Sequence, residues 1–332
     1  PFPGFAAVLP NLGLEKIIST YVNLSDEEEM KRFRKETEEF LNKKRQDIFG
    51  INFEQKEIQK ITREFMLKDD EEQKLLLEVL PRFDLSSSQI SNIISENRES
   101  FSIESSLKEI LENPYIIFEQ YIGADSDDNI PFYKIDNGIL PSPDYGLEDY
   151  LDAGSGERLR AFCVDELNRI AAHSFGKAET IMNFINSRLE RMPEWKQYVF
   201  KLKNFKVDEE ILSKALHIRE DKDGVLYLYL KQVFEDERII ESVFKDLAER
   251  PNISLRMTIT EEKFKEKLKN ENSVIYKKEK AKYEEILNNQ AKTCMKIFNK
   301  PICVLSGAAG TGKTTVIKAI VENLERAHGS GI

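Results

Sequence analysis

Residues 301–315 read Pro-Ile-Cys-Val-Leu-Ser-Gly-Ala-Ala-Gly-Thr-Gly-Lys-Thr-Thr. The part from Gly307 to Thr314 fits the pattern G-x-x-x-x-G-K-[ST], which is typical of a phosphate-binding loop. The apolar run 302–305 has the length of a buried parallel strand, and a helix is expected from Lys313 to about Ala327. Strand, loop and helix in this order form the context that such a loop requires. The sequence therefore predicts a nucleotide-binding site here.

Each position of this loop has a physical role. Glycines at 307, 310 and 312 let the backbone turn so that successive N–H groups point into one anion-sized hollow. The N-terminus of the following helix adds the positive end of its dipole. We expect a site for ATP and Mg²⁺ in which the catalytic residues are Lys313, reaching the β- and γ-phosphates, and Thr314, ligating the metal. The predicted nucleotide-binding residues of the loop are Gly307, Ala308, Ala309, Gly310, Thr311, Gly312, Lys313, Thr314 and Thr315.

A motor built on such a loop needs more than this stretch. It requires a second acidic motif at the end of another strand and a parallel sheet covered on both faces. After Thr315 the sequence contains one expected helix and a Gly-Ser-Gly run, and it opens on Pro1 rather than Met. We therefore expect residues 276–332 to be the start of an α/β P-loop domain, catalytically incomplete alone and part of a longer protein.

The composition is that of an ordinary soluble protein, with 40% hydrophobic and 33% charged residues. A net charge of −10 argues against a uniformly basic nucleic-acid-binding surface, although it allows a local basic groove. The three cysteines lie far apart, so they indicate neither a disulfide framework nor a zinc cluster. No run approaches the length of a membrane span, and free thiols suit a reducing compartment. We expect a cytoplasmic protein without membrane contact.

Residues 1–122 are expected to form a helical domain. Capping boxes at Ser25 and at Ser86 open two of its helices. Short helices with tight turns are similar to a degenerate helix-hairpin-helix module, but Pro81-Arg82-Phe83 stands where the usual glycines would be. A helical domain without DNA contact is the favoured alternative, and the acidic charge favours a protein partner. The expected helices span 14–21, 25–45, 53–67, 71–80, 86–94, 105–111 and 116–122.

Residues 123–156 are rich in Asp, Gly, Pro and Ser, which predicts a domain boundary or a long surface loop. Two short strands are expected inside it, at 132–135 and 139–140. Residues 157–275 are then expected to form a helical accessory domain with a β-hairpin. The hairpin strands, 218–221 and 225–230, flank a turn at Lys222-Asp223-Gly224 and make the unit similar to a winged helix. The remaining expected elements are helices at 158–173, 177–191, 209–217, 233–250, 261–268 and 277–298, and a strand at 253–259.

One segment of this accessory domain combines basic and aromatic residues. Between Arg188 and Lys206 there are six basic residues against two acidic ones, interleaved with Trp195, Tyr198 and Phe200. This combination suits contact with a nucleic-acid backbone and stacking on bases. The alternative is an amphipathic segment with lysines on its solvent side. The candidate nucleic-acid contacts are Arg188, Arg191, Lys196, Lys201 and Lys203.

With these residues in view, the chain resembles the RecD-like branch of the superfamily 1 DNA helicases. The loop 307–315 is similar to that branch's phosphate loop. Gln290, seventeen residues before Gly307, stands on the preceding helix, where the family has a glutamine that contacts the adenine edge. The run Leu111-Glu-Asn-Pro-Tyr115 and the helix–hairpin–helix region 158–250 look like the accessory region that precedes the motor.

The resemblance implies a mainly α N-terminal region leading into the first of two RecA-like domains. It also implies an ATP-dependent helicase that moves 5′ to 3′ on single-stranded or forked DNA, with Gln290 as a nucleotide contact. Two alternatives stay open. One is a non-catalytic helical module that binds protein or DNA and has an inert P-loop; the other is a different P-loop ATPase.

Overall fold

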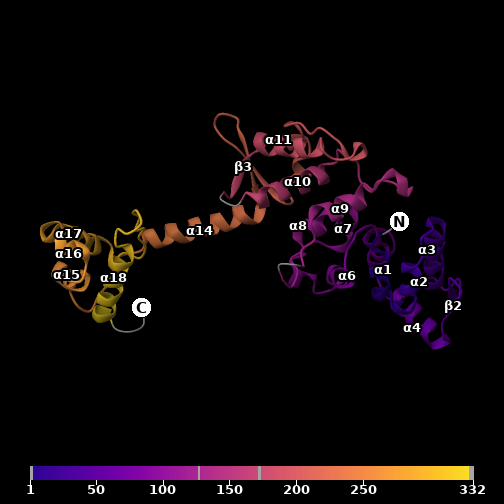
Figure 1. Cartoon of the computed structure of the whole chain (residues 1–332), viewed down its shortest axis with the longest axis horizontal. Helices are drawn as coiled ribbons and strands as arrows, with labels where there is room; N and C mark the ends of the chain where they lie inside the picture. Colours follow the sequence, from indigo (N-terminus) through magenta and orange to yellow (C-terminus); the bar gives the residue numbers. More distant parts are fainter. Residues whose placement is uncertain (1–2, 126–127, 171–172, 329–332) are drawn as a thin grey trace. The chain divides into compact units, whose positions relative to one another are not determined.

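The computed structural model describes residues 3–125, 128–170 and 173–328, which are mainly helical with small antiparallel sheets (Figure 1). The predicted mainly α character is confirmed. The chain divides into two compact units, residues 1–234 and 235–332, at a different place from the predicted domain boundaries. Among the described residues, no helix is both long enough and apolar enough to cross a membrane.

The first unit begins with helices that bury aromatic side chains. Phe33 and Phe40 of α3 are fully buried, and Phe40 lies 4.7 Å from Phe53 between ring centroids. The predicted capping box at Ser25 is wrong: the cap of α3 is Asp26, whose carboxylate accepts from the N–H of Glu29. The elements here are α1 (Phe5–Val8), α2 (Ile18–Val22), α3 (Glu27–Leu41), β1 (Asp47–Ile48), β2 (Ile51–Asn52) and α4 (Gln55–Met66).

The next helices continue the same hydrophobic core. The capping box of Ser86 and Gln89 is confirmed, with both reciprocal hydrogen bonds present. Within 81–83, where helix-hairpin-helix glycines would stand, Pro81 and Arg82 belong to a short 3₁₀ turn (Leu80–Arg82) and Phe83 is its C-cap. The elements are α5 (Asp70–Lys74), a π-helical turn (Leu75–Val79), α6 (Ser87–Ile94), α7 (Leu107–Glu112), α8 (Tyr115–Gln120) and α9 (Phe132–Ile139).

Helix α9 replaces the two short strands that were predicted at 132–135 and 139–140, so that prediction is wrong. Phe132, Ile135 and Ile139 are all buried, and their spacing places them along one helical stripe. Asp136 is buried beside them and bonds to charged partners. The amphipathic helical pattern therefore decides the local structure of this segment.

A three-stranded antiparallel sheet follows, in the order β3-β5-β4. The predicted hairpin is confirmed: Leu228 of β5 pairs with Ile218 of β4 and also with Gly176 of β3. Strand β3 was not predicted, and the helix expected at 209–217 ends early because Leu216 already pairs in the sheet. The predicted end of the helix 158–173 falls partly on 171–172, outside the described residues. The elements are α10 (Gly156–Arg169), β3 (Phe175–Lys177), α11 (Ala178–Leu189), α12 (Asn204–Val207), α13 (Glu209–Leu212), β4 (Leu216–Glu220), β5 (Leu226–Leu230) and α14 (Lys231–Glu249).

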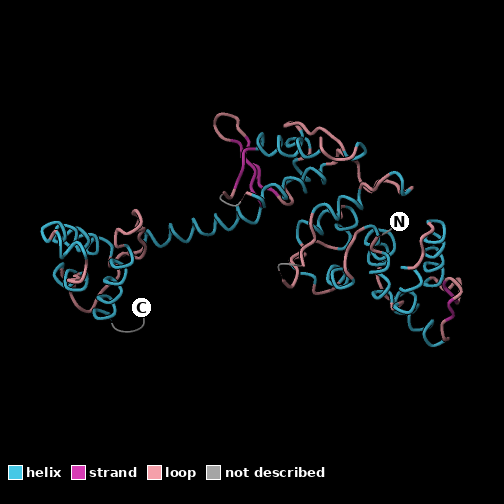
Figure 2. The backbone as a smooth tube through the Cα atoms, viewed as in Figure 1, coloured by secondary structure: helices cyan, strands magenta, loops and turns pink. Residues whose placement is uncertain are grey.

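The second unit is helical wherever it is regular (Figure 2). Phe264, Leu268, Ala291 and Cys294 form its core with residues of the last helix, including Val316. The predicted helix 261–268 is confirmed in full, and the helix predicted from Lys313 is confirmed. The elements are α15 (Glu261–Leu268), α16 (Val274–Lys278), α17 (Lys280–Ile297) and α18 (Lys313–His328).

Two strands that were predicted in this part of the chain, at 253–259 and 302–305, are not formed. Both segments are irregular, and Val304 is 90% exposed. A strand needs a neighbouring strand to satisfy its N–H and C=O groups, and residues 235–328 contain none. The strand prediction at 302–305 is therefore wrong for this structure, because the described residues of the second unit contain no strand to pair with it.

Candidate functional site

The predicted phosphate-binding loop is an exposed segment that leads directly into α18. Gly310 and Gly312 have φ angles of +78° and +82°, which residues other than glycine rarely adopt. Thr311 closes the loop, because its hydroxyl donates to the carbonyl of Ala308 at 2.9 Å. At Gly307 the requirement is space instead, since a Cβ there would lie 2.9 Å from Oγ1 of Thr311. The local structure thus explains why glycine stands at 307, 310 and 312.

Lys313 folds back over the start of this loop. Its Nζ donates to the carbonyls of Gly307 and Ala308, at 2.7 and 2.8 Å. No carboxylate of the described residues forms an ion pair with it. The ammonium is therefore held at the loop by neutral oxygens, and its charge is not neutralised.

The N-terminus of α18 supplies further groups at the same place. The first N–H groups of any helix lack intrahelical partners, and they carry the positive end of the helix dipole. Helix α18 is 16 residues long, and its intrahelical bonding begins with Val316 N–H to the carbonyl of Gly312 at 3.0 Å. Thr314 and Thr315 are exposed. The hydroxyl of Thr314 is thus available for a ligand.

Gln290 comes to the loop from a different helix, α17. Its Nε2 donates to the carbonyl of Thr311 at 3.2 Å. A Cβ at position 312 would lie only 2.5 Å from the same Nε2 atom, so the glycine permits this approach. The structure therefore brings Gln290 together with Thr311, Gly312 and Lys313, as one constellation from α17, the loop and α18.

The groups of this constellation are of the types that contact a nucleoside triphosphate and a divalent cation in a phosphate-binding loop. Around Gly310 nothing lies within 4 Å of where a Cβ would stand, so the loop is open on that side. The ammonium of Lys313 suits the β- and γ-phosphates, and the hydroxyl of Thr314 suits Mg²⁺. Ala308 and Ala309 are exposed, so their backbone is accessible.

The basic segment of the first unit is resolved into buried and exposed members. Lys196 is 5% exposed, and its Nζ donates to Asp136 Oδ2 at 2.9 Å and to Asn137 Oδ1 at 2.7 Å. Arg188 forms ion pairs with Asp165 and Glu166. The prediction that Lys196 contacts nucleic acid is wrong, because its ammonium is buried and paired with the carboxylate of Asp136. Arg188 is also committed to protein carboxylates.

The buried network around Lys196 has Asp136 at its centre. Arg158 Nε donates to Asp136 Oδ1 at 2.9 Å, and the hydroxyl of Tyr115 donates to the same oxygen at 2.7 Å. Burial alone would raise the pKa of Asp136, but the charges of Arg158 and Lys196 outweigh it and hold that pKa below its usual value. Burial lowers the pKa of Lys196. These groups have the character of a structural core.

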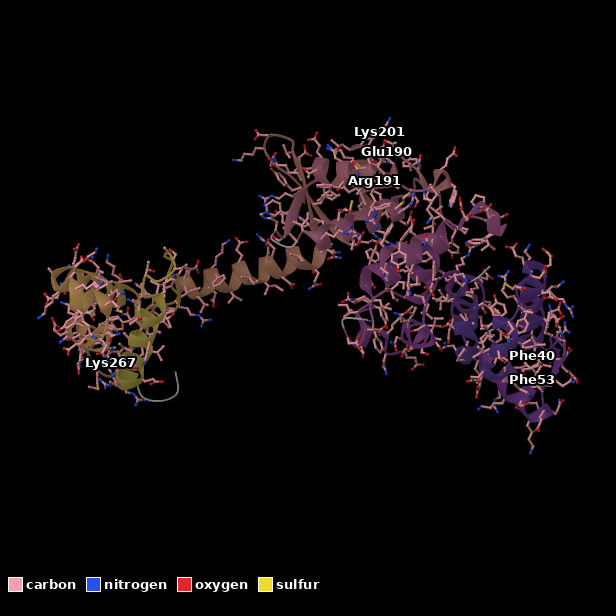
Figure 3. The ribbon with its side chains drawn as sticks, in the orientation of Figure 1. Phe40, Phe53, Glu190, Arg191, Lys201 and Lys267 are labelled. Carbon is pink, nitrogen blue, oxygen red and sulfur yellow. The ribbon has the colours of Figure 1, made fainter. Side chains whose placement is uncertain are left out.

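The other candidates of this segment are at the surface (Figure 3). Arg191 and Lys201, which Figure 3 labels, are exposed, and Lys203 is exposed as well. Trp195 and Tyr198 are partly exposed, at 39% and 41%, and could stack on bases. Phe200 is 1% exposed and belongs to the core instead.

A hollow of about 350 Å³ lies beside this surface, at the tip of the hairpin. Lys203 and Lys206 line it together with Gly224 and Val225. Lys206 was counted among the basic residues but was not predicted as a contact; its position three residues after Lys203 was the available signal. Nζ of Lys206 lies 3.6 Å from Oε2 of Glu220, so Lys206 forms an exposed ion pair with this carboxylate.

Comparison with known proteins gives one informative match. An uncharacterized protein of Methanocaldococcus jannaschii, MJ1519, is 28% identical to the chain over 344 residues. The match covers 99% of this chain but 28% of that protein, so the chain spans little more than a quarter of its relative's length. No protein-family model matches the chain. No solved structure matches it either.

Proposed function

We propose that this chain holds the ATP-binding start of a RecD-like, ATP-dependent DNA helicase or translocase, acting in the cytoplasm on single-stranded or forked DNA. One observation carries the proposal: Gln290 from α17 and Lys313 from α18 converge on the same glycine loop. A Gly-rich turn before an ordinary helix requires no glutamine against it. An adenine-contacting glutamine beside a phosphate loop is what the resemblance implies.

The residues of the loop have distinct tasks in this proposal. Lys313 would exchange the carbonyls of Gly307 and Ala308 for phosphate oxygens, which bear full charge and form stronger bonds. Thr314 would hold Mg²⁺ through its hydroxyl, and the N–H groups at the start of α18 would face the phosphates. Bound Mg·ATP supplies the transferable γ-phosphoryl group, with the metal neutralising charge that develops on it.

Gln290 would select the base. Its amide has both a donor and an acceptor, so it can match an edge that also presents both. One N–H of its Nε2 donates to the carbonyl of Thr311, which leaves the second N–H as a donor and Oε1 as an acceptor for the base. We propose that this side chain favours adenine over guanine.

The accessory region supports a DNA role through its exposed residues. Arg191, Lys201 and Lys203 are accessible, and the hairpin gives this part a winged-helix-like character. Phosphate contacts of this kind weaken steeply with salt. We propose that they guide DNA toward the motor and contribute affinity without base selection.

Equilibrium binding of a fluorescent ATP analogue, with and without Mg²⁺, tests the nucleotide site. Lys313→Ala should weaken binding by about 10- to 100-fold, since a hydrogen-bonded charge contributes about 1.5–3 kcal/mol. Lys318→Ala is the matched control, because Lys318 is exposed on the same helix and away from the loop. Unchanged binding in Lys313→Ala, with the helical signal retained, would refute the nucleotide site.

The helicase assignment needs a separate measurement on the protein as the cell produces it. Strong stimulation of ATP hydrolysis by single-stranded DNA is expected for a RecD-like motor. Hydrolysis that ignores DNA would favour a different P-loop ATPase. Absence of nucleotide binding in a folded protein would favour the non-catalytic binding module.

A further inference from the structure

A groove of about 920 Å³ lies in the first unit, between α4 and the segment that follows α3. Its lining is basic, although the chain as a whole has a net charge of −10. Five cationic side chains face it against one carboxylate, that of Glu64. The cations are Lys43, Arg45, Lys56, Lys60 and Arg63.

Four of these five charges are not neutralised by the protein. Arg45 is the exception, because its guanidinium lies 3.2 Å from Glu36 and 3.3 Å from Asp47. The other four form no ion pair with any carboxylate of the described residues, and all four are exposed. The groove therefore presents four exposed cations, without an ion pair among the described residues, that a ligand can contact.

The fold fixes where these cations lie. Helix α4 turns Ile61 and Phe65 into the core, which places the opposite face toward solvent. Lys56, Lys60 and Arg63 follow at i, i+4 and i+7, so they line one side of the helix.

Lys43 is held from the opposite wall of the groove. It has a left-handed φ of +59°, and its N–H bonds to the carbonyl of Phe40 at 3.0 Å. The two walls of the groove thus both present cations from fixed backbone positions.

We propose that this groove binds the phosphate backbone of a nucleic acid. The helical rise from Lys56 to Arg63 is about 10 Å, and one strand of a duplex carries about three phosphates over that length. Three cations on α4 therefore match three successive phosphates. The amide side chains of Gln55 and Gln59 alternate with them and can contact sugars or base edges.

The concave shape disfavours a flat lipid surface as the partner. The acidic charge of residues 1–122 favoured a protein partner for this region, but the groove has the opposite local sign. This proposal does not depend on the phosphate loop, since the groove and the loop belong to separate units.

Fluorescence anisotropy with a labelled 20-base-pair duplex and a labelled 20-nucleotide oligo(dT), without nucleotide and over a range of salt, tests the groove. Lys56→Glu/Lys60→Glu/Arg63→Glu should weaken binding at low salt by at least tenfold. Because three cations then no longer neutralise phosphates, the slope of log K against log salt for the duplex should become less steep by about 3 units. The arm that binds more tightly identifies duplex or single strand as the ligand.

The matched control is Lys35→Glu/Lys44→Glu/Lys74→Glu, which changes net charge equally at exposed positions outside the groove. Equal reductions of affinity in the two triple variants would overturn the proposal, because only net charge would then matter. Binding of poly-glutamate or anionic vesicles by the native chain, without nucleic-acid binding, would also overturn it. Lys56→Gln/Lys60→Gln/Arg63→Gln serves if the charge-reversed variant fails to fold.

The triple groove variant should keep its affinity for the ATP analogue. Loss of nucleic-acid binding with nucleotide binding intact supports the groove alone. Unchanged nucleotide binding in Lys313→Ala would refute the nucleotide site and leave the groove proposal untouched. The two proposals can therefore fail independently.

Discussion

Two lysines of this chain, Lys196 and Lys313, are held by oxygen atoms in different surroundings. The ammonium of Lys196 contacts the carboxylate of Asp136 inside the first unit, where it is 5% exposed. The ammonium of Lys313 donates to two backbone carbonyls, at an exposed loop of the second unit. The first charge is neutralised by its partner and serves the fold. The second has no carboxylate partner among the described residues, and a bound phosphate would supply the counter-charge.

This difference is invisible in the sequence, where both residues are lysines in polar surroundings. Burial of a charge is tolerated only if a partner neutralises it and hydrogen bonds satisfy it. Asp136, Arg158 and Tyr115 meet that requirement around Lys196. The largest expected effects of mutation therefore lie in the buried network, and the largest effects on ligand binding lie at the loop.

Asp136→Ala should be the most destabilising of the changes considered. It leaves Arg158 and Lys196 buried without their carboxylate, which typically costs about 3–5 kcal/mol in the free energy of unfolding. Urea denaturation followed by circular dichroism measures this cost. Asp84→Ala is the control, because the carboxylate of Asp84, in its ion pair with Lys134, is 71% exposed and should contribute at most about 1 kcal/mol. Equal destabilisation in the two variants would mean that the buried network does not hold the fold.

The same network should respond to acid. Burial raises the pKa of Asp136, but the charges of Arg158 and Lys196 lower it by more. The pKa of Asp136 in the folded chain is therefore below its value in the unfolded chain. A depressed folded pKa contributes stability that is present above the unfolded value, about 3.9 for Asp, and is lost as pH falls through the folded value. We expect the stability difference between the native chain and Asp136→Asn to be full at pH 6 and to shrink below about pH 4.

Glu119 makes this comparison between variants necessary. Burial raises the pKa of its carboxyl despite the neighbouring Arg160, so its contribution to stability changes with pH in the opposite sense. The difference between the native chain and Asp136→Asn cancels that contribution, because Glu119 is present in both. A difference that stays constant from pH 6 to pH 3 would contradict the assigned pKa direction.

The sequence predicted the loop better than its surroundings. Glycine at 310 and at 312 is favoured by the positive φ of these positions, and local backbone geometry is what a motif encodes. The strand at 302–305 failed because a strand depends on a neighbour elsewhere in the chain. Gln290 was found only through the resemblance, since its contact with Thr311 spans 21 residues and leaves no periodic signal.

The candidate nucleic-acid contacts also show that long-range contacts cannot be read from a local sequence pattern. Lys196 and Lys201 are five residues apart in a segment of uniform basic and aromatic character. Only the position of Asp136, sixty residues earlier, makes one of them structural. The groove cations at 56, 60 and 63 have helical spacing that the sequence does contain. What the sequence lacked there was the opposite wall, contributed by Lys43.

Gly312→Ala should have the smallest effect on stability and a clear effect on binding. Its φ of +82° strains an alanine by about 1 kcal/mol. The added Cβ would also lie 2.5 Å from Nε2 of Gln290, so the amide has to move away from the loop. We expect the free energy of unfolding to fall by about 1 kcal/mol, and the affinity for a fluorescent ATP analogue to fall by about tenfold or more.

Gly146→Ala is the matched control for this change. Gly146 also has a positive φ, +58°, but no atom lies within 4 Å of its Cβ position. The control therefore carries the backbone strain without the contact, and it should leave nucleotide affinity unchanged. If both variants bind nucleotide equally well, the approach of Gln290 to the loop has no role in the site. If only Gly312→Ala loses affinity, and adding Gln290→Ala causes no further loss in the double variant, displacement of the Gln290 amide is the cause. Nucleotide binding at Lys313 would then depend on the position of Gln290, as the burial of Lys196 depends on Asp136.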